Sequence, residues 1–231
     1  MKLFNTYRYI NLSLTAVKVC GILLLLFLLV SCEKWYDTKE VSHISTFPRF
    51  EIIGGDFLSF VVVDSGEYED PGARAFDNGV QLAVYSQGEV DLTKAGIYFI
   101  RYYAENEDGV YSLGERVVAV TRNDVSFHDL SGIYENTSWE PAAQMKVERI
   151  DSNGLYNCSE IFGYPGTKTT GKFVDLGKNL LVLLHGEGDF GEYASVQGEY
   201  SLTSLNWTIY LTGGAYAGVG FPVEWNKIEE N

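Results

Sequence analysis

The chain has 231 residues, of which 17 are basic and 31 acidic, giving a formal net charge of −14. No acid stands among the first 31 residues, so the remaining 200 carry 14 bases against 31 acids. This charge excludes nucleic acid as a partner, because neutralising phosphates requires clustered Lys and Arg. With 46% apolar and 14% aromatic residues, the chain can bury a core, which excludes an intrinsically disordered protein.

The N-terminal segment, residues 1–31, has the layout of a secretory signal peptide. A basic stretch ends at Lys18, and an almost wholly apolar run of 12 residues follows from Val19 to Val30. This run is short for a transmembrane helix, which needs about 20 apolar residues, but it suits the hydrophobic region of a signal.

The signal ends in the four residues from Leu29 to Cys32 (LVSC), which resemble the bacterial lipobox. The resemblance implies cleavage before Cys32, lipid on its sulfur and on its new amino group, and a lipid bilayer as partner through this acylated residue. The alternative is an ordinary signal peptide or anchor that happens to contain a cysteine. Residues 32–46 are polar and predict a tether, in which Glu33 and Asp37 resemble the acidic export signals of Bacteroidetes surface lipoproteins.

The cysteine count predicts a mature chain without an intrachain disulfide. Cys20 leaves with the signal, Cys32 is used by the anchor, and Cys158 then has no partner. Cys158 lies in a strand-like run and is predicted to be a buried, small apolar residue. A catalytic thiol would need a nearby base, and the local sequence supplies none.

After the tether, short apolar or alternating runs separated by Gly, Asn and Asp predict an all-β protein. The first block, residues 47–121, suits an immunoglobulin-like (Ig-like) sandwich. Period-2 alternation in the run from Ile97 to Ala104 predicts that Tyr98, Ile100, Tyr102 and Ala104 share one face. The predicted strands of this block are Arg49–Ile53, Phe57–Val63, Val80–Tyr85, Ile97–Ala104 and Glu115–Thr121.

Two stretches of this block carry a family resemblance. The segment from Tyr68 to Gly79 (YEDPGARAFDNG) and the later segment from Asp91 to Tyr98 (DLTKAGIY) resemble the bacterial surface Ig-like repeat. The sequence departs from the repeat at Asn106, where the family usually has Asp, and at Val110, where it has Asn. If the family's Asp has a turn or calcium role, these departures predict that the role is weakened here.

The second block, residues 124–231, predicts a compact antiparallel β barrel or sandwich. The run from Leu180 to Leu184 is continuously apolar and is predicted to be covered on both faces. Parts of the block resemble the C-terminal domain of unknown function in Bacteroidetes lipoproteins. The predicted strands are Ser131–Glu135, Ala143–Ile150, Leu155–Ser159, Thr169–Asp175, Leu180–His185, Gly198–Leu202, Trp207–Leu211 and Gly220–Lys227.

No motif for catalysis, metal or cofactor binding is present in the sequence. His43, His128 and His185 lack the spacing of a zinc site, and no serine lies in a nucleophile elbow. Glu187 and Asp189 are the best local pair of acids for a glycosidase or a calcium site, but a solvated hairpin explains them more simply. We therefore expect a protein that is not an enzyme and has no metal or cofactor.

The aromatic residues of the second block divide into two groups. Trp207 and Trp225 alternate with apolar strand residues and are predicted to lie in the core. Tyr164 and Tyr216 are flanked by glycine-rich backbone, and Trp139 precedes Glu140-Pro141, so these three are predicted to lie on loops and to contact a ligand.

Together these features predict a non-enzymatic outer-membrane lipoprotein of the cell envelope that is exposed at the surface. It would act as a binding or adhesion module for a glycan or a surface protein. One alternative is a glycan-binding accessory or weak glycan hydrolase of a polysaccharide-utilisation system, and another is a purely structural component of the envelope.

Overall fold

The computed structural model describes residues 45–127 and 129–228. The predicted signal peptide, Cys32, His43, His128 and nearly all of the predicted tether lie outside these residues. The described chain is almost entirely β, which confirms the predicted fold class, with one short 3₁₀ helix, η2 (Asn123–Phe127). None of the helices described is long and apolar enough to cross a membrane.

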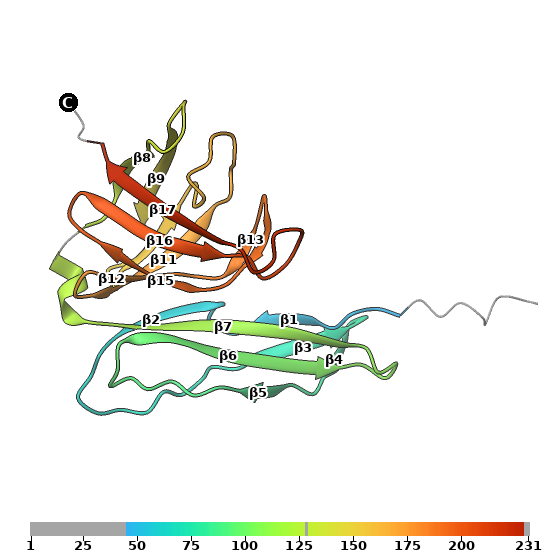
Figure 1. Cartoon of the computed structure of the whole chain (residues 1–231). Coiled ribbons are helices and arrows are strands. Elements are labelled where there is room, and N and C mark those ends of the chain that lie inside the picture. Colours follow the sequence, from blue (N-terminus) through green and yellow to red (C-terminus); the bar gives the residue numbers. More distant parts are fainter. Residues whose placement is uncertain (1–44, 128, 229–231) are drawn as a thin grey trace, which may run out of the picture. The chain divides into compact units, whose positions relative to one another are not determined.

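The first block forms two sheets that enclose a small core (Figure 1). Ile100, Tyr102 and Val118 are buried between the sheets, and Phe50 and Phe60 pack against them. One sheet has the order β1 (Arg49–Ile52), β3 (Ala73–Asp77), β4 (Val80–Leu82), and the other has the order β2 (Phe57–Val61), β7 (Tyr111–Thr121), β6 (Gly96–Glu105), β5 (Tyr85–Gln87).

The strand predictions for this block hold with two exceptions. The predicted strand Val80–Tyr85 is correct only for its first part, because the chain passes there from one sheet to the other and forms β4 and the separate strand β5. The segment between these two strands still carries an apolar residue because Val84 packs against the core between the sheets. In addition, β3 forms in a segment for which no strand is predicted, and its residue Ala75 is fully buried.

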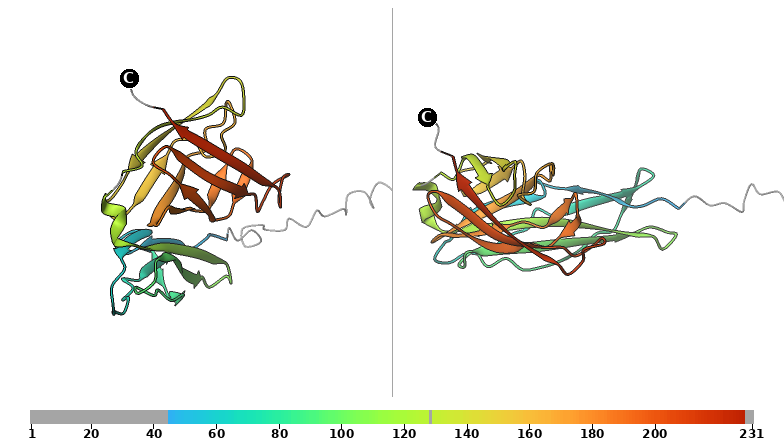
Figure 2. Two further views of the ribbon diagram at one scale, coloured as in Figure 1. Left: turned by 60° about the vertical axis from the view of Figure 1, so that its left-hand side comes forward. Right: turned by 45° about the horizontal axis from the view of Figure 1, so that its top comes forward.

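The second block is a closed barrel of eight strands, and each strand pairs antiparallel with its neighbours (Figure 2). The barrel follows chain order, and β17 closes it by pairing with β8. The hairpin β13 (Gly186–Gly188) and β14 (Gly191–Tyr193) is inserted between β12 and β15. The barrel strands are β8 (Gly132–Asn136), β9 (Ala143–Arg149), β10 (Leu155–Cys158), β11 (Gly171–Gly177), β12 (Leu180–Leu183), β15 (Val196–Tyr200), β16 (Ser204–Tyr210) and β17 (Gly220–Lys227).

Large side chains fill the interior of the barrel. Trp207 and Trp225 are buried in this core, as predicted, and the indole N–H of Trp207 donates to the carbonyl of Ile161 at 3.0 Å. Cys158 is also buried there as a free cysteine, in agreement with its predicted role. Burial raises the pKa of its thiol to about 12, so the thiolate required of a nucleophile is strongly disfavoured.

The outer face of β10, β11 and β12 packs against the first block. Leu155, Val174, Val182 and Leu184 form one hydrophobic cluster with Ala119 of β7. Leu181 and Leu183 instead point into the barrel core. The apolar run from Leu180 to Leu184 is therefore covered on both faces, as its sequence predicts.

Candidate functional site

The three predicted ligand residues lie on connections at one end of the barrel. Trp139 follows β8, Tyr164 follows β10 and Tyr216 follows β16. In a barrel that follows chain order, alternate connections lie at the same end, and these three connections all belong to one set. Their side chains are 50%, 44% and 52% exposed, respectively.

Phe190 joins these three residues into one group, which we call the aromatic end. It lies at the turn of the β13–β14 hairpin, between Gly188 and Gly191. Its ring centroid is 6.3 Å from that of Tyr164 and 6.2 Å from that of Tyr216, and Trp139 lies 4.8 Å from Tyr164. The three pairs meet edge to face, at interplanar angles of 67° to 86°, so the aromatic end offers projecting rings.

Hydrogen bonds hold the loops of the aromatic end together. The Asp189 carboxylate accepts from the backbone N–H of Lys168 at 2.8 Å and from the Thr169 hydroxyl at 3.0 Å. The buried Glu160 carboxylate accepts from the N–H groups of Phe162 at 2.7 Å and Thr169 at 3.1 Å. Burial raises the pKa of Glu160, although these backbone donors oppose the rise. The loops are thus fixed before any ligand arrives.

Close backbone approach also fixes the hairpin against the β16–β17 connection. Gly191 has a φ of +114°, and a Cβ atom there would lie 2.8 Å from the carbonyl oxygen of Gly213. Only glycine fits such an approach without displacing the backbone. The close approach of Gly191 to Gly213 therefore holds Phe190, the residue before Gly191, beside Tyr216.

The acids considered for catalysis or calcium do not form a metal cluster. Among the residues that the structure describes, no group of three or more His, Cys, Asp or Glu is placed to hold a metal ion. Glu187 is exposed on β13, whereas Asp189 ties the hairpin to the β10–β11 loop. His185 lies elsewhere, 3.0 Å from the Glu115 carboxylate and against the ring of Phe99.

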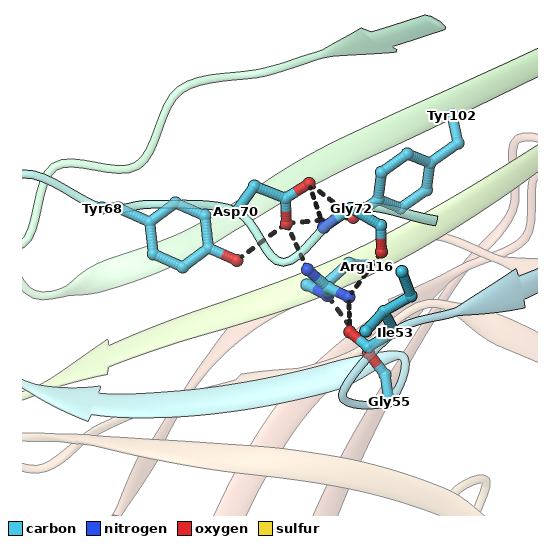
Figure 3. Close-up of polar contacts among 7 residues, drawn as sticks. All are labelled: Ile53, Gly55, Tyr68, Asp70, Gly72, Tyr102 and Arg116. Carbon is cyan, nitrogen blue, oxygen red and sulfur yellow. Dashed lines mark hydrogen bonds and ion pairs between the residues drawn. The ribbon is translucent and has the colours of Figure 1, made fainter. Parts of the chain in front are cut away.

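In the first block, the repeat motif forms a buried polar clamp around Arg116 (Figure 3). The guanidinium is fully buried and pairs with the carboxylate of Asp70. It also donates to the carbonyls of Ile53, Gly55 and Gly72. Sequence reasoning missed Arg116, because an arginine on a strand ordinarily reads as a solvent-facing residue.

Two tyrosines complete the coordination of Asp70. The hydroxyl of Tyr68 donates to this carboxylate at 3.1 Å, and that of Tyr102 donates at 2.9 Å. Burial and the adjacent carboxylate raise the pKa of both tyrosines, so both hydroxyls remain donors at neutral pH. The clamp is satisfied by groups within the fold, which assigns the motif a structural role.

Asn106 holds the turn at which the family usually has Asp. Its side-chain oxygen accepts from the N–H groups of Asp108 at 3.1 Å and Val110 at 2.9 Å. Its amide group donates to the Thr46 carbonyl and to the Asp77 carboxylate. An amide supplies donors that a carboxylate lacks, so Asn106 holds the turn and also binds its neighbours.

Comparisons with known proteins agree with the Ig-like prediction. Residues 58–120 match the family described as "Bacterial surface protein, Ig-like domain". This part of the chain is therefore a bacterial surface Ig-like domain, which fits a location in the cell envelope or at its surface. No curated protein matches the sequence.

One solved structure that is similar to this chain is a lipoprotein from Bacteroides thetaiotaomicron. The two sequences are 24% identical, and the alignment covers 78% of this chain and 100% of that chain with a TM-score of 0.33.

Proposed function

We propose that the protein is a membrane-anchored, non-enzymatic outer-membrane lipoprotein that acts as a binding or adhesion module at the cell surface. The match of residues 58–120 to a surface domain supports the location, and the lipobox-like segment ending at Cys32 supports the anchor. In this proposal the aromatic end of the barrel makes the contacts with the ligand.

The observation that carries the proposal is the chain of ring contacts in which Tyr164 and Tyr216 meet Phe190 and Trp139 meets Tyr164. Large aromatic side chains that stay about half exposed on fixed loops are typical of binding surfaces, where they provide contact area at little cost in conformational entropy. The geometry favours binding over hydrolysis, since a hydrolase needs two carboxyl groups facing one substrate and Asp189 is engaged between two loops.

The double substitution Tyr164→Ala and Tyr216→Ala should weaken ligand binding and leave the fold intact. Both side chains are about half exposed, so we expect the free energy of unfolding to change by no more than about 1 kcal/mol for each. Binding can be measured with the full chain in a sugar-free detergent, against a glycan array and against outer-membrane extract.

Phe127→Ala is the matched control for this experiment, because Phe127 is an 87% exposed aromatic residue of η2 and lies outside the aromatic end. A ligand that is retained by the control and lost by the double variant supports the aromatic end. The proposal fails if the double variant unfolds as a core substitution does, or if it keeps every ligand of the unaltered chain.

The anchor has a separate test in Cys32→Ala. Each buried CH₂ of an acyl chain contributes about 0.8 kcal/mol, and more than one chain is needed for stable attachment to a membrane. We expect the variant to appear in the soluble periplasmic fraction or as uncleaved precursor, without incorporated lipid label. Unchanged membrane fractionation and unchanged labelling would contradict the lipoprotein assignment.

A further inference from the structure

One face of the β2–β7–β6–β5 sheet is covered at one end and open at the other. At the covered end, Ile97 of β6 and Val117 and Ala119 of β7 pack against the barrel strands. Side chains alternate between the faces of a strand, so Tyr103 of β6 and Leu113 of β7 belong to this same face, farther along the strands. At this end of the strands, beyond the part that the barrel covers, the face is exposed, and Leu113 is 67% accessible to solvent.

Three tyrosines form a row across the open end of this face. Tyr85 lies directly opposite Tyr103 in the β5–β6 register. Their ring centroids are 6.4 Å apart, and that of Tyr111 is 5.7 Å from Tyr103. The Tyr103 and Tyr111 rings are stacked at 28°, and Tyr85 is inclined to Tyr103 by 46°. The ring planes of this tyrosine row (Tyr85, Tyr103 and Tyr111) are therefore closer to parallel than those of the aromatic end, whose rings meet at steep angles.

Hydrogen-bonding groups border the tyrosine row. The Tyr103 hydroxyl donates to the Glu105 carboxylate, which orients the ring. Arg101, two residues before Tyr103 on the same face, pairs with Glu115 at 3.3 Å, and 70% of its side chain is exposed. Arg101 donates several hydrogen bonds and the carboxylates accept them, so both kinds of partner for a hydroxyl group lie beside the rings.

The tyrosine row leads to a cavity of about 660 Å³ between the sheet and the barrel. Glu115 lies at the junction, since it pairs with Arg101 beside the row and also lines the cavity. His185, which binds Glu115, and Lys172 line the same cavity. A ligand longer than the row would thus meet further polar groups in this direction.

The chemistry of this surface selects among occupants. The face of a tyrosine ring carries partial negative charge and attracts the C–H groups of a sugar ring. The hydroxyl groups of the sugar need hydrogen-bond donors and acceptors beside that ring. The ring spacing is close to the length of one pyranose residue. The net charge of −14 opposes a polyanionic glycan and also a second copy of this chain.

We propose that the tyrosine row binds a neutral glycan chain, with successive pyranose rings stacked on Tyr85, Tyr103 and Tyr111. Arg101, Glu105 and Glu115 then bind the hydroxyl groups of the sugars. This site is separate from the aromatic end, and it stands or falls independently of the proposed role of that surface.

The test uses the full chain in a sugar-free detergent, titrated calorimetrically with cellohexaose, xylohexaose and mannohexaose. An oligomer of galacturonic acid serves as the anionic counterpart. We expect at least one neutral oligosaccharide to bind and Tyr103→Ala to weaken it about tenfold, which corresponds to about 1.4 kcal/mol. Tyr103→Phe removes the bond to Glu105 and keeps the ring, so it should retain most of the affinity.

Tyr210→Ala is the control, since Tyr210 is an exposed tyrosine of the barrel block that belongs to neither proposed surface. Binding that is retained by this variant and weakened by Tyr103→Ala supports the site, provided that the melting temperatures agree. Three results overturn it: no binding of any neutral oligosaccharide, binding that Tyr103→Ala leaves unchanged, or binding that Tyr164→Ala abolishes. Equal or tighter binding of the anionic oligomer overturns the assigned ligand class.

Discussion

Replacing Asp70 with Ala should lower the free energy of unfolding by about 3–5 kcal/mol, because the substitution strands a buried charge. Arg116 is fully buried, and Asp70 is its carboxylate partner. The carbonyls of Ile53, Gly55 and Gly72 remain as acceptors but do not neutralise the guanidinium. The hydroxyls of Tyr68 and Tyr102 would also lose their acceptor. Urea unfolding of the full chain in detergent, followed by fluorescence, measures the loss.

Lys94→Ala is the matched control for the effect of breaking an ion pair. Lys94 pairs with Asp91 at 2.8 Å, but 77% of its side chain is exposed. Exposed pairs contribute about 0–1 kcal/mol, so this variant should remain close to the unaltered chain. A loss of less than about 1 kcal/mol in Asp70→Ala, similar to the control, would show that the clamp adds little to the stability of this block.

The sequence motif around Asp70 identifies the Ig-like domain, but it does not reveal which residue of the fold pairs with the Asp70 carboxylate. Tyr68, Asp70 and Gly72 are adjacent in sequence, whereas Arg116 lies 46 positions after Asp70. Local pattern predicts the turn, because Gly72 adopts a φ of +82° that suits glycine. The partner of the carboxylate depends on strand pairing, which no local pattern specifies.

The barrel shows the same division between local and distant information. Alternating runs predict all eight strands, and the continuous run from Leu180 to Leu184 predicts cover on both faces, which the structure confirms. The pairing of β17 with β8 joins residues nearly 100 positions apart (Tyr134 faces Lys227), so closure into a barrel could not be chosen over a sandwich.

The sequence predicts only part of the two candidate sites. Glycine-rich flanks correctly place Tyr164 and Tyr216 on exposed connections, and the order of a closed barrel then brings them to one end. The sequence does not predict Phe190 as part of this site, because the acid-rich segment around it indicates only a solvated hairpin. The sequence pattern does not predict the tyrosine row for another reason. Tyr103 lies on a strand face that mixes apolar and charged residues, and its neighbours Tyr85 and Tyr111 come from other strands.

Trp207→Ala should destabilise the barrel by about 3–5 kcal/mol, because it opens a large cavity in a filled interior. Trp207 is 4% exposed and lies beside the ring of Phe173, with centroids 6.1 Å apart. Its removal also leaves the carbonyl of Ile161 without the indole donor. Trp139→Ala is the matched control, since Trp139 is 50% exposed and should cost about 1 kcal/mol or less. An equal change in the free energy of unfolding for the two variants would show that Trp207 is not a principal part of the core. A large decrease for Trp207→Ala alone would show that Trp207 stabilises the barrel, whereas Trp139 remains available for contact with a ligand.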